Sequence, residues 1–275
     1  MTVYFNGSFC PKDDVSISPD DRGFLFGDGV YEVPRAIDGR FFRLDAHKKR
    51  LERSLKAIRL FDAVDTEALW DDLDELLART GLDTGHAKVY LQITRGAAPR
   101  QHAFPASDTE PTIYAKASRH EPPTEMWEEG VKVILQPDQR WARCDIKSLN
   151  YLPNVLANQR AQEAGAYEAL LVREGMVTEG THSSVAAVYD GTVVTHPLTN
   201  HTLPSVTRGV LLELCDTLNI PVDETPIPKA DLPDADELLV LGTTTGLTPV
   251  VQVEDWTVGD GMPGPVTREL QDAFR

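Results

Sequence analysis

Cysteine is scarce in this sequence, and so are the signals that would send a chain out of the cell. Only three cysteines occur, Cys10, Cys144 and Cys215, and no two of them form a CxxC pair. An odd number of isolated cysteines excludes a disulfide framework and is typical of free thiols in a reducing compartment. The first residues carry neither the basic nor the apolar segment of a secretory signal. We therefore expect a cytoplasmic protein.

Basic side chains are also few. Lysine and arginine number 27 against 43 acidic residues, a formal net charge of −16. This balance excludes the basic surface that nucleic-acid backbones require, and it disfavours binding to anionic membranes. Most of the excess lies late in the chain: residues 1–120 hold 17 basic and 19 acidic side chains, and residues 121–275 hold 10 and 24. Surface acid that maintains solubility explains this, although adaptation to a saline habitat remains an alternative.

Several common motifs are missing as well. The sequence has no GxGxxG or GxxxxGK[ST] loop for a nucleotide, no HExxH and no GxSxG. Its seven histidines lack metal-ligand spacing, so we expect no metal. No apolar run approaches the roughly 18 residues of a membrane span.

What is present is an ordinary globular composition of 41% hydrophobic residues in 275. Hairpin patterns alternate with a few helical ones, which predicts an α+β fold rather than a doubly wound sheet. Consecutive prolines and a change of charge balance mark a boundary near residue 120. We predict a small N-terminal domain (1–118), a linker (119–124) and a larger C-terminal domain (125–275).

Four segments could carry chemistry. A lysine between apolar residues, Lys147, could lose its proton easily and form a Schiff base. Hydroxyls near a strand end (243–246) and a helix start (202–207) could bind phosphate. Arg100 with its neighbours could clamp a carboxylate. Taken singly, each has a plainer interpretation as a surface lysine, a cap or an exposed loop. The residues alone predict an α+β protein that could bind a small phosphorylated ligand.

Taken together, these segments resemble the fold-type IV family of pyridoxal-phosphate enzymes, and within it the D-amino acid aminotransferases. The resemblance covers nearly the whole chain. The matching stretches, in order, are DRG (21–23) with FGDGVYEV (26–33), His47 with Arg50 and Leu51, TRG (94–96) with PRQHAFP (99–105), RW (140–141) with RCDIKSLN (143–150), VTEG (177–180), THP (195–197), and Thr243 and Thr244 with TPV (248–250).

The family resemblance implies a small N-terminal α/β domain, a larger C-terminal domain with a barrel-like sheet, and pyridoxal 5′-phosphate as cofactor. It implies that Lys147 is the Schiff-base and proton-transfer residue. Glu179 would contact the pyridine nitrogen, and Leu203 would pack on the ring. The cofactor phosphate would be held by Arg50, by the amides of Val206 and Thr207, and by Thr243 and Thr244.

The resemblance also implies the reaction, a ping-pong transfer of an amino group between a D-amino acid such as D-alanine and a 2-oxo acid such as pyruvate or 2-oxoglutarate. Tyr31, Arg100 and His102 match the residues that hold the substrate α-carboxylate in D-specific members. In the family this Arg-x-His loop comes from the neighbouring subunit, so a homodimer with a shared active site is implied.

Alternatives within the same fold are a branched-chain L-amino acid or (R)-amine aminotransferase and, less favoured, an aminodeoxychorismate lyase. A binding protein without catalysis is disfavoured because the lysine and the glutamate are both present. Four departures from the family pattern concern substrate range. Tyr151 follows Asn150 as in branched-chain enzymes, His182 and Ser184 replace other polar residues, and Gly246 replaces a larger residue and could widen the pocket.

Overall fold

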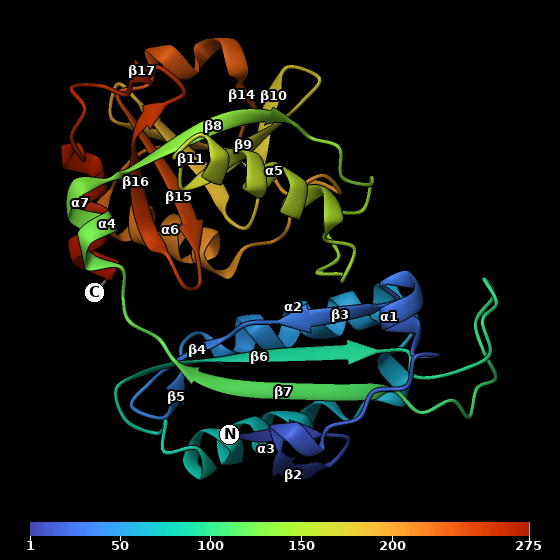
Figure 1. Ribbon diagram of the computed structural model, residues 1–275. Helices are drawn as coiled ribbons and strands as arrows, with labels where there is room; N and C mark the ends of the chain where they lie inside the picture. The colour runs from blue at the N-terminus through green and yellow to red at the C-terminus, as the bar shows by residue number, and fades with distance from the viewer. Residues whose placement is uncertain (275) are drawn as a thin grey trace. The chain divides into compact units, whose positions relative to one another are not determined.

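Two units, each with its own core, make up the computed structural model, which describes residues 1–274 (Figure 1). The first unit contains Met1–Glu121 and Ile146–Asn150, and the second contains Pro122–Asp145 and the chain from Tyr151 onward. The chain first leaves the first unit at Glu121, inside the segment predicted as a linker. The prediction that 125–275 forms one domain needs a correction, because the short segment with Lys147 belongs to the first unit.

The first unit is built on a seven-stranded sheet with the order β2-β1-β7-β6-β4-β5, and β3 also pairs with β6. All of its strand pairs are antiparallel. Helices α2 and α3 pack on the sheet. The strands are β1 (Thr2–Phe5), β2 (Ser8–Pro11), β3 (Gly29–Glu32), β4 (Arg35–Ile37), β5 (Arg40–Phe41), β6 (His86–Thr94) and β7 (Thr112–Arg119), and the helices are α1 (Arg22–Phe26), α2 (Leu44–Ala57) and α3 (Thr66–Arg79), with short 3-10 turns at Lys12–Asp14 and Phe61–Ala63.

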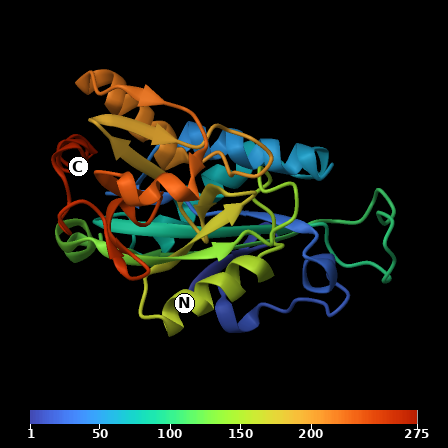
Figure 2. The same ribbon diagram turned by 90° about the horizontal axis from the view of Figure 1, so that it is seen from above.

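Local sequence explains these elements. Asp65 caps α3 by accepting a hydrogen bond from the Ala68 amide, and leucines at helical spacing along α3 are wholly buried. The predicted single strand 31–37 is instead two strands, because Pro34 between them has no amide to donate to the ladder. The segment between β6 and β7 has no strand or helix, and it projects away from its sheet (Figure 2).

The second unit contains a ten-stranded sheet with the order β13-β12-β11-β15-β16-β8-β9-β10-β14, and β17 pairs with β16. Its ladder mixes both senses, since β8 runs parallel to β9 and to β16. The strands are β8 (Val131–Pro137), β9 (Glu168–Arg173), β10 (Met176–Gly180), β11 (Ser184–Tyr189), β12 (Thr192–Thr195), β13 (Val222–Asp223), β14 (Ile227–Pro228), β15 (Glu237–Gly242), β16 (Gly246–Val253) and β17 (Trp256–Thr257), and the helices are α4 (Thr124–Glu129), α5 (Leu152–Glu163), α6 (Val206–Leu218) and α7 (Pro265–Phe274), with a 3-10 turn at Lys229–Asp234.

Helices cover this sheet through apolar contacts. Leu211 and Cys215 of α6 and Leu270 of α7 pack against leucines of β15, while alanines of α5 pack on β8 and β9. Together, the two sheets and their helices confirm the α+β fold class.

The turn between β15 and β16 is supported from behind by α4 and α7. Trp127 Nε1 donates to the Thr245 carbonyl, and Gln271 Nε2 donates to the Leu247 carbonyl over 2.9 Å. Gly246 has φ +65°, and a Cβ there would approach Trp127 to 2.9 Å. The interpretation of Gly246 as a residue that widens the pocket is therefore wrong. Glycine is needed there by the backbone and by the packing of α4.

Candidate active site

The segment that carries Lys147 runs beside β3 of the first unit. The Tyr31 amide donates to the Lys147 carbonyl over 3.0 Å, and the Leu149 amide donates to the Gly29 carbonyl over 3.1 Å. On its other side, the Lys147 amide donates to Ser54 Oγ of α2 over 3.2 Å. The lysine side chain is half-buried, with Nζ 4.2 Å from the centroid of the Tyr31 ring. Main-chain bonds therefore fix Lys147, and its amine lies on an aromatic face that favours a cation.

A fully buried charge cluster lies in the same unit. Arg50 donates through Nε to Glu32 Oε1 over 2.6 Å and through Nη2 to Oε2 over 2.9 Å. His47 Nδ1 lies 3.0 Å from Glu32 Oε2, and both side chains are 0% exposed. Burial opposes ionisation of Glu32, but the charges and hydrogen bonds of Arg50 and His47 outweigh it and hold the Glu32 pKa well below its usual range.

Burial lowers the pKa of His47, because the charges around it do not compensate for desolvation. Since an ionised carboxylate only accepts hydrogen bonds, Nδ1 carries the ring proton. Nε2 is buried without a hydrogen-bond partner in the described chain. The cluster is therefore a carboxylate held by one arginine and one neutral histidine.

Arg100 and His102 lie on the exposed segment between β6 and β7. Both contact the ring of Phe26: Arg100 Cζ lies 5.1 Å from its centroid, and the His102 ring lies 5.9 Å away with an edge-on orientation. Phe26 ends α1. The two residues predicted to hold a carboxylate thus share one aromatic platform within the first unit.

In the second unit, Glu179 lies near the end of β10 and is bound from two sides. Arg140 Nη1 donates to Oε1, and the Leu203 amide donates to Oε2 over 2.9 Å. Burial raises the Glu179 pKa, and the nearby Arg140 charge opposes that rise. Leu203, predicted to pack on a cofactor ring, thus also binds Glu179 through its backbone.

Arg140 also binds Asp138, with Nη2 2.8 Å from Oδ2. Burial disfavours the Asp138 carboxylate, but Arg140 first and Arg173 second lower its pKa below the usual range. The roles of Arg140 and Asp138 were not predicted from the sequence. The only available signal was that a buried glutamate requires a cation, which periodicity cannot assign to a particular arginine.

The other predicted residues of the second unit occupy two backbone turns. Ser205 Oγ accepts from the Arg208 amide over 3.1 Å and caps α6, so the amides of Val206 and Thr207 open the helix. Those first amides have no intrahelical acceptor. Thr243 and Thr244 are half-buried in the turn between β15 and β16.

Two of the departures from the family pattern lie in or against the turn that follows Glu179. His182 Nε2 lies 3.1 Å from Tyr167 Oη, and Tyr151 Oη donates to the Thr181 carbonyl over 3.2 Å. Glu168, fully buried beneath this turn, accepts from Ser183 Oγ over 2.5 Å. These contacts order the turn.

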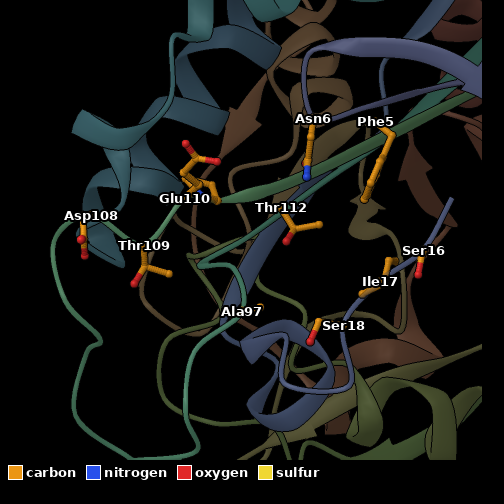
Figure 3. Close-up of a pocket in the computed structure, with 11 residues that line it drawn as sticks. Phe5, Asn6, Ser16, Ile17, Ser18, Ala97, Asp108, Thr109, Glu110 and Thr112 are labelled. Carbon is orange, nitrogen blue, oxygen red and sulfur yellow. The ribbon is translucent and has the colours of Figure 1, made fainter.

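The predicted site residues thus form two groups, one in each unit. A hollow elsewhere in the first unit contains none of them. It is lined by residues of β1 and of the segments 16–18 and 108–112, and Figure 3 shows Asn6, Ser18 and Glu110 among its lining side chains. Residues 1–274 bring no three His, Cys, Asp or Glu side chains together as metal ligands. No helix in that range is long and apolar enough to cross a membrane.

Comparison with known proteins places this chain in a family. The sequence pattern described as "Amino-transferase class IV" matches residues 29–253, and the chain belongs to that family. Enzymes of this class are pyridoxal-phosphate dependent.

Among its relatives, the D-alanine aminotransferase of Staphylococcus haemolyticus is 42% identical over 99% of this chain and 96% of its own. That of Bacillus licheniformis is 40% identical over 100% and 96%. Solved structures give the same fold. The Escherichia coli branched-chain amino acid aminotransferase superposes with a TM-score of 0.91 at 25% identity, covering 99% of this chain and 93% of that one. The T.th. branched-chain amino acid aminotransferase, solved with pyridoxamine 5′-phosphate, gives 0.88 at 25% identity and covers 99% and 92%.

Proposed function

We propose that this enzyme transfers the amino group of a D-amino acid, such as D-alanine, to a 2-oxo acid. The observation that carries the proposal is the 42% identity to a D-alanine aminotransferase across nearly the full length of both chains. The branched-chain enzymes share the fold at only 25% identity, which supports that alternative less.

The side chains present fit pyridoxal phosphate. Thr245 Oγ1 is buried without a hydrogen-bond partner in the described chain, in the same turn as Thr243 and Thr244. Hydroxyls at such a turn and open amides at a helix start are donors that a phosphate dianion can use. Val206 and Thr207 would bind the phosphate through their amides, and Arg50 would add a guanidinium.

Glu179 would hold the pyridine nitrogen. Its carboxylate is buried, and Arg140 keeps a positive charge beside it. When bound, the cofactor supplies an aldehyde that links to amines and a ring that accepts the electrons released at the substrate Cα. Leu203 would pack on that ring, and its amide already fixes one oxygen of Glu179.

Lys147 would move the proton. Its amine would take the proton from the substrate Cα and return it on the cofactor side, one group serving as both base and acid. Since Ser54 and β3 fix its backbone, only the side-chain torsions need to change during this transfer.

Tyr31, Arg100 and His102 would hold the substrate α-carboxylate. A guanidinium, an imidazole and a phenol together make a strong anion site. Fixing the carboxylate determines which enantiomer directs its Cα–H at Lys147, and this is the source of the D-preference.

We further propose that the enzyme is a cytoplasmic homodimer in which the Arg100 loop completes the site of the neighbouring subunit. Two features support a subunit interface. The loop is exposed, and α5 leaves Leu152, Val155 and Leu156 at 68%, 55% and 55% exposure. Exposed apolar clusters of this kind mark contact surfaces. The three free cysteines are consistent with a reducing compartment.

The decisive experiment is a half-reaction of the purified holoenzyme without an oxo acid. D-Alanine should bleach the absorbance band of the lysine-bound cofactor, and L-leucine should not. Lys147→Ala should abolish both the band and turnover. Bleaching by L-leucine alone would assign the enzyme to the branched-chain group, and a fully active Lys147→Ala variant would refute the proposed role of Lys147.

A further inference from the structure

The segment that carries Arg100 and His102 has no regular structure of its own, and yet it is anchored. It runs from the end of β6 to the start of β7 without a strand or helix, and Arg100, Gln101 and His102 are all exposed. An exposed loop samples many conformations, so a carboxylate site built on it needs an external constraint.

A buried arginine supplies one. Arg22, on α1 and 3% exposed, donates through Nη1 to the carbonyl of Gln101 over 2.7 Å. Gln101 is the residue between Arg100 and His102. The Arg22 amide also donates to the Gly96 carbonyl over 2.9 Å, at the start of the same segment. The contact therefore fixes the peptide that separates the two carboxylate-binding side chains.

The anchor is itself held in place by Asp28. Arg22 Nε donates to Asp28 Oδ2 over 2.8 Å, and Arg95 donates to both oxygens of the same carboxylate over 2.9 and 3.0 Å. Although burial opposes ionisation, the hydrogen bonds from Arg95 and Arg22 lower the Asp28 pKa, so the carboxylate stays charged at neutral pH. A guanidinium with Nε bound to a carboxylate can direct Nη1 in only one direction.

Aromatic contacts complete the arrangement. The Phe26 ring contacts Arg22 Cζ at 4.9 Å as well as Arg100 and His102. Further along, Phe104 lies under Arg95, with Cζ 3.8 Å from its centroid. Every residue of the segment that the proposed function uses is thus linked to the Arg22–Asp28–Arg95 cluster within the same chain, whichever subunit's site the loop serves.

We propose that Arg22 is a positioning residue that presets the Arg100–His102 loop for the substrate carboxylate, a role that rests on the proposed function. Arg22 contacts no reacting atom. It acts through the Gln101 carbonyl and the Phe26 ring, and its removal should weaken recognition of the carboxylate selectively.

The test compares D-alanine with D-alaninol, which replaces the carboxylate by a hydroxymethyl group. In the holoenzyme, Arg22→Met should raise KM for D-alanine by about tenfold and change the rate with D-alaninol by less than about twofold. The absorbance of the bound cofactor should stay unchanged. Arg79→Met is the matched control, since Arg79 is an exposed arginine paired with Glu75, and it should leave both substrates unaffected.

Arg22→Lys keeps the buried charge and guards against misfolding. A lysine cannot bind Asp28 and the Gln101 carbonyl with a rigid fork, so this variant should show the same selective loss to a smaller degree. Trypsin should also cleave after Arg100 faster in both Arg22 variants than in the parent.

Equal losses on both substrates, or no loss on either, would overturn the role of Arg22 while leaving the transaminase assignment intact. If the parent enzyme does not react with D-alanine, the proposed function fails first, and the two failures are thereby distinguished.

Discussion

At the scale of single residues, the first unit buries a cluster of charged and titratable side chains. Glu32, His47 and Arg50 are each less than 10% exposed and satisfy one another through specific hydrogen bonds. Removing one member of such a cluster leaves the others desolvated without a partner, which costs more than the original interaction contributes.

Replacing Glu32 by Gln should therefore be severe. The neutral amide leaves Arg50 buried without a counter-charge, so urea unfolding should show a loss of about 3–5 kcal/mol. Affinity for pyridoxal phosphate should also fall, because Arg50 loses its orientation. Glu67→Gln is the control. Glu67 pairs with Lys48 but is 75% exposed, so its loss should stay within about 0.5 kcal/mol. Similar losses in both variants would contradict the importance of burial.

The same cluster predicts how stability depends on pH. The His47 pKa is lowered from its ordinary value of 6.5, so below that pH the unfolded chain binds more protons and stability falls. The Glu32 pKa is lowered from 4.5, so a second decline begins below that pH.

Urea unfolding at pH 4 to 8 should thus show stability falling with acidification in two stages. A His47→Gln variant should have a shallower slope in the upper stage only. Stability that rises as pH falls from 7 to 5 would show that His47 is protonated in the native state.

At the scale of elements, helix α6 and helix α3 offer a matched comparison. Each begins with a side-chain cap, Ser205 Oγ to the Arg208 amide and Asp65 Oδ1 to the Ala68 amide, both over 3.1 Å. Only α6 starts at amides that we assign to the cofactor phosphate.

Ser205→Ala and Asp65→Ala should each lower the free energy of unfolding by about 1 kcal/mol. Only Ser205→Ala should also raise the dissociation constant for pyridoxal phosphate, because the Val206 and Thr207 amides lose their fixed direction. Fluorescence titration of the apoenzymes measures this. Equal cofactor affinity in the two variants would remove the start of α6 from the phosphate site.

At the scale of the whole molecule, the proposed shared site can be tested by subunit mixing. Lys147→Ala and Arg100→Ala should each be inactive at low D-alanine. If the Arg100 loop serves the neighbouring subunit, each mixed dimer has one complete site. Random exchange should then restore about one quarter of the parent activity. If the loop serves its own subunit, each mixed dimer again pairs one defective lysine with one defective loop in separate sites, and mixing restores nothing.

Much of the fold could be predicted because local signals determine it. Ser205 caps α6 and Asp65 caps α3 as their residue types indicate, and the hairpin turns at Asn6-Gly7 and Asp190-Gly191 follow from residues that tolerate positive φ. The short helix α1 was not predicted, because five residues are too few to show a helical period.

The candidate site could be predicted only in part. Ordered motifs indicated Lys147 and Glu179 through family resemblance, and the class IV pattern confirms the family. The partners of those residues, Arg140 for Glu179 and Glu32 for Arg50, were not predicted. Such ion pairs join residues 39 and 18 positions apart, and pattern arguments do not reach across those separations.

By itself, the sequence determined the acidic composition, the α+β class and the family, because these follow from residue types, local periodicity and ordered motifs. Only the tertiary structure decided that residues 146–150 belong with the first unit, that Gly246 faces Trp127, and that Arg22 binds the loop of Arg100. These are contacts between segments distant in the chain. They depend on how sheets and turns bring backbone and charge together, which no single stretch of sequence specifies.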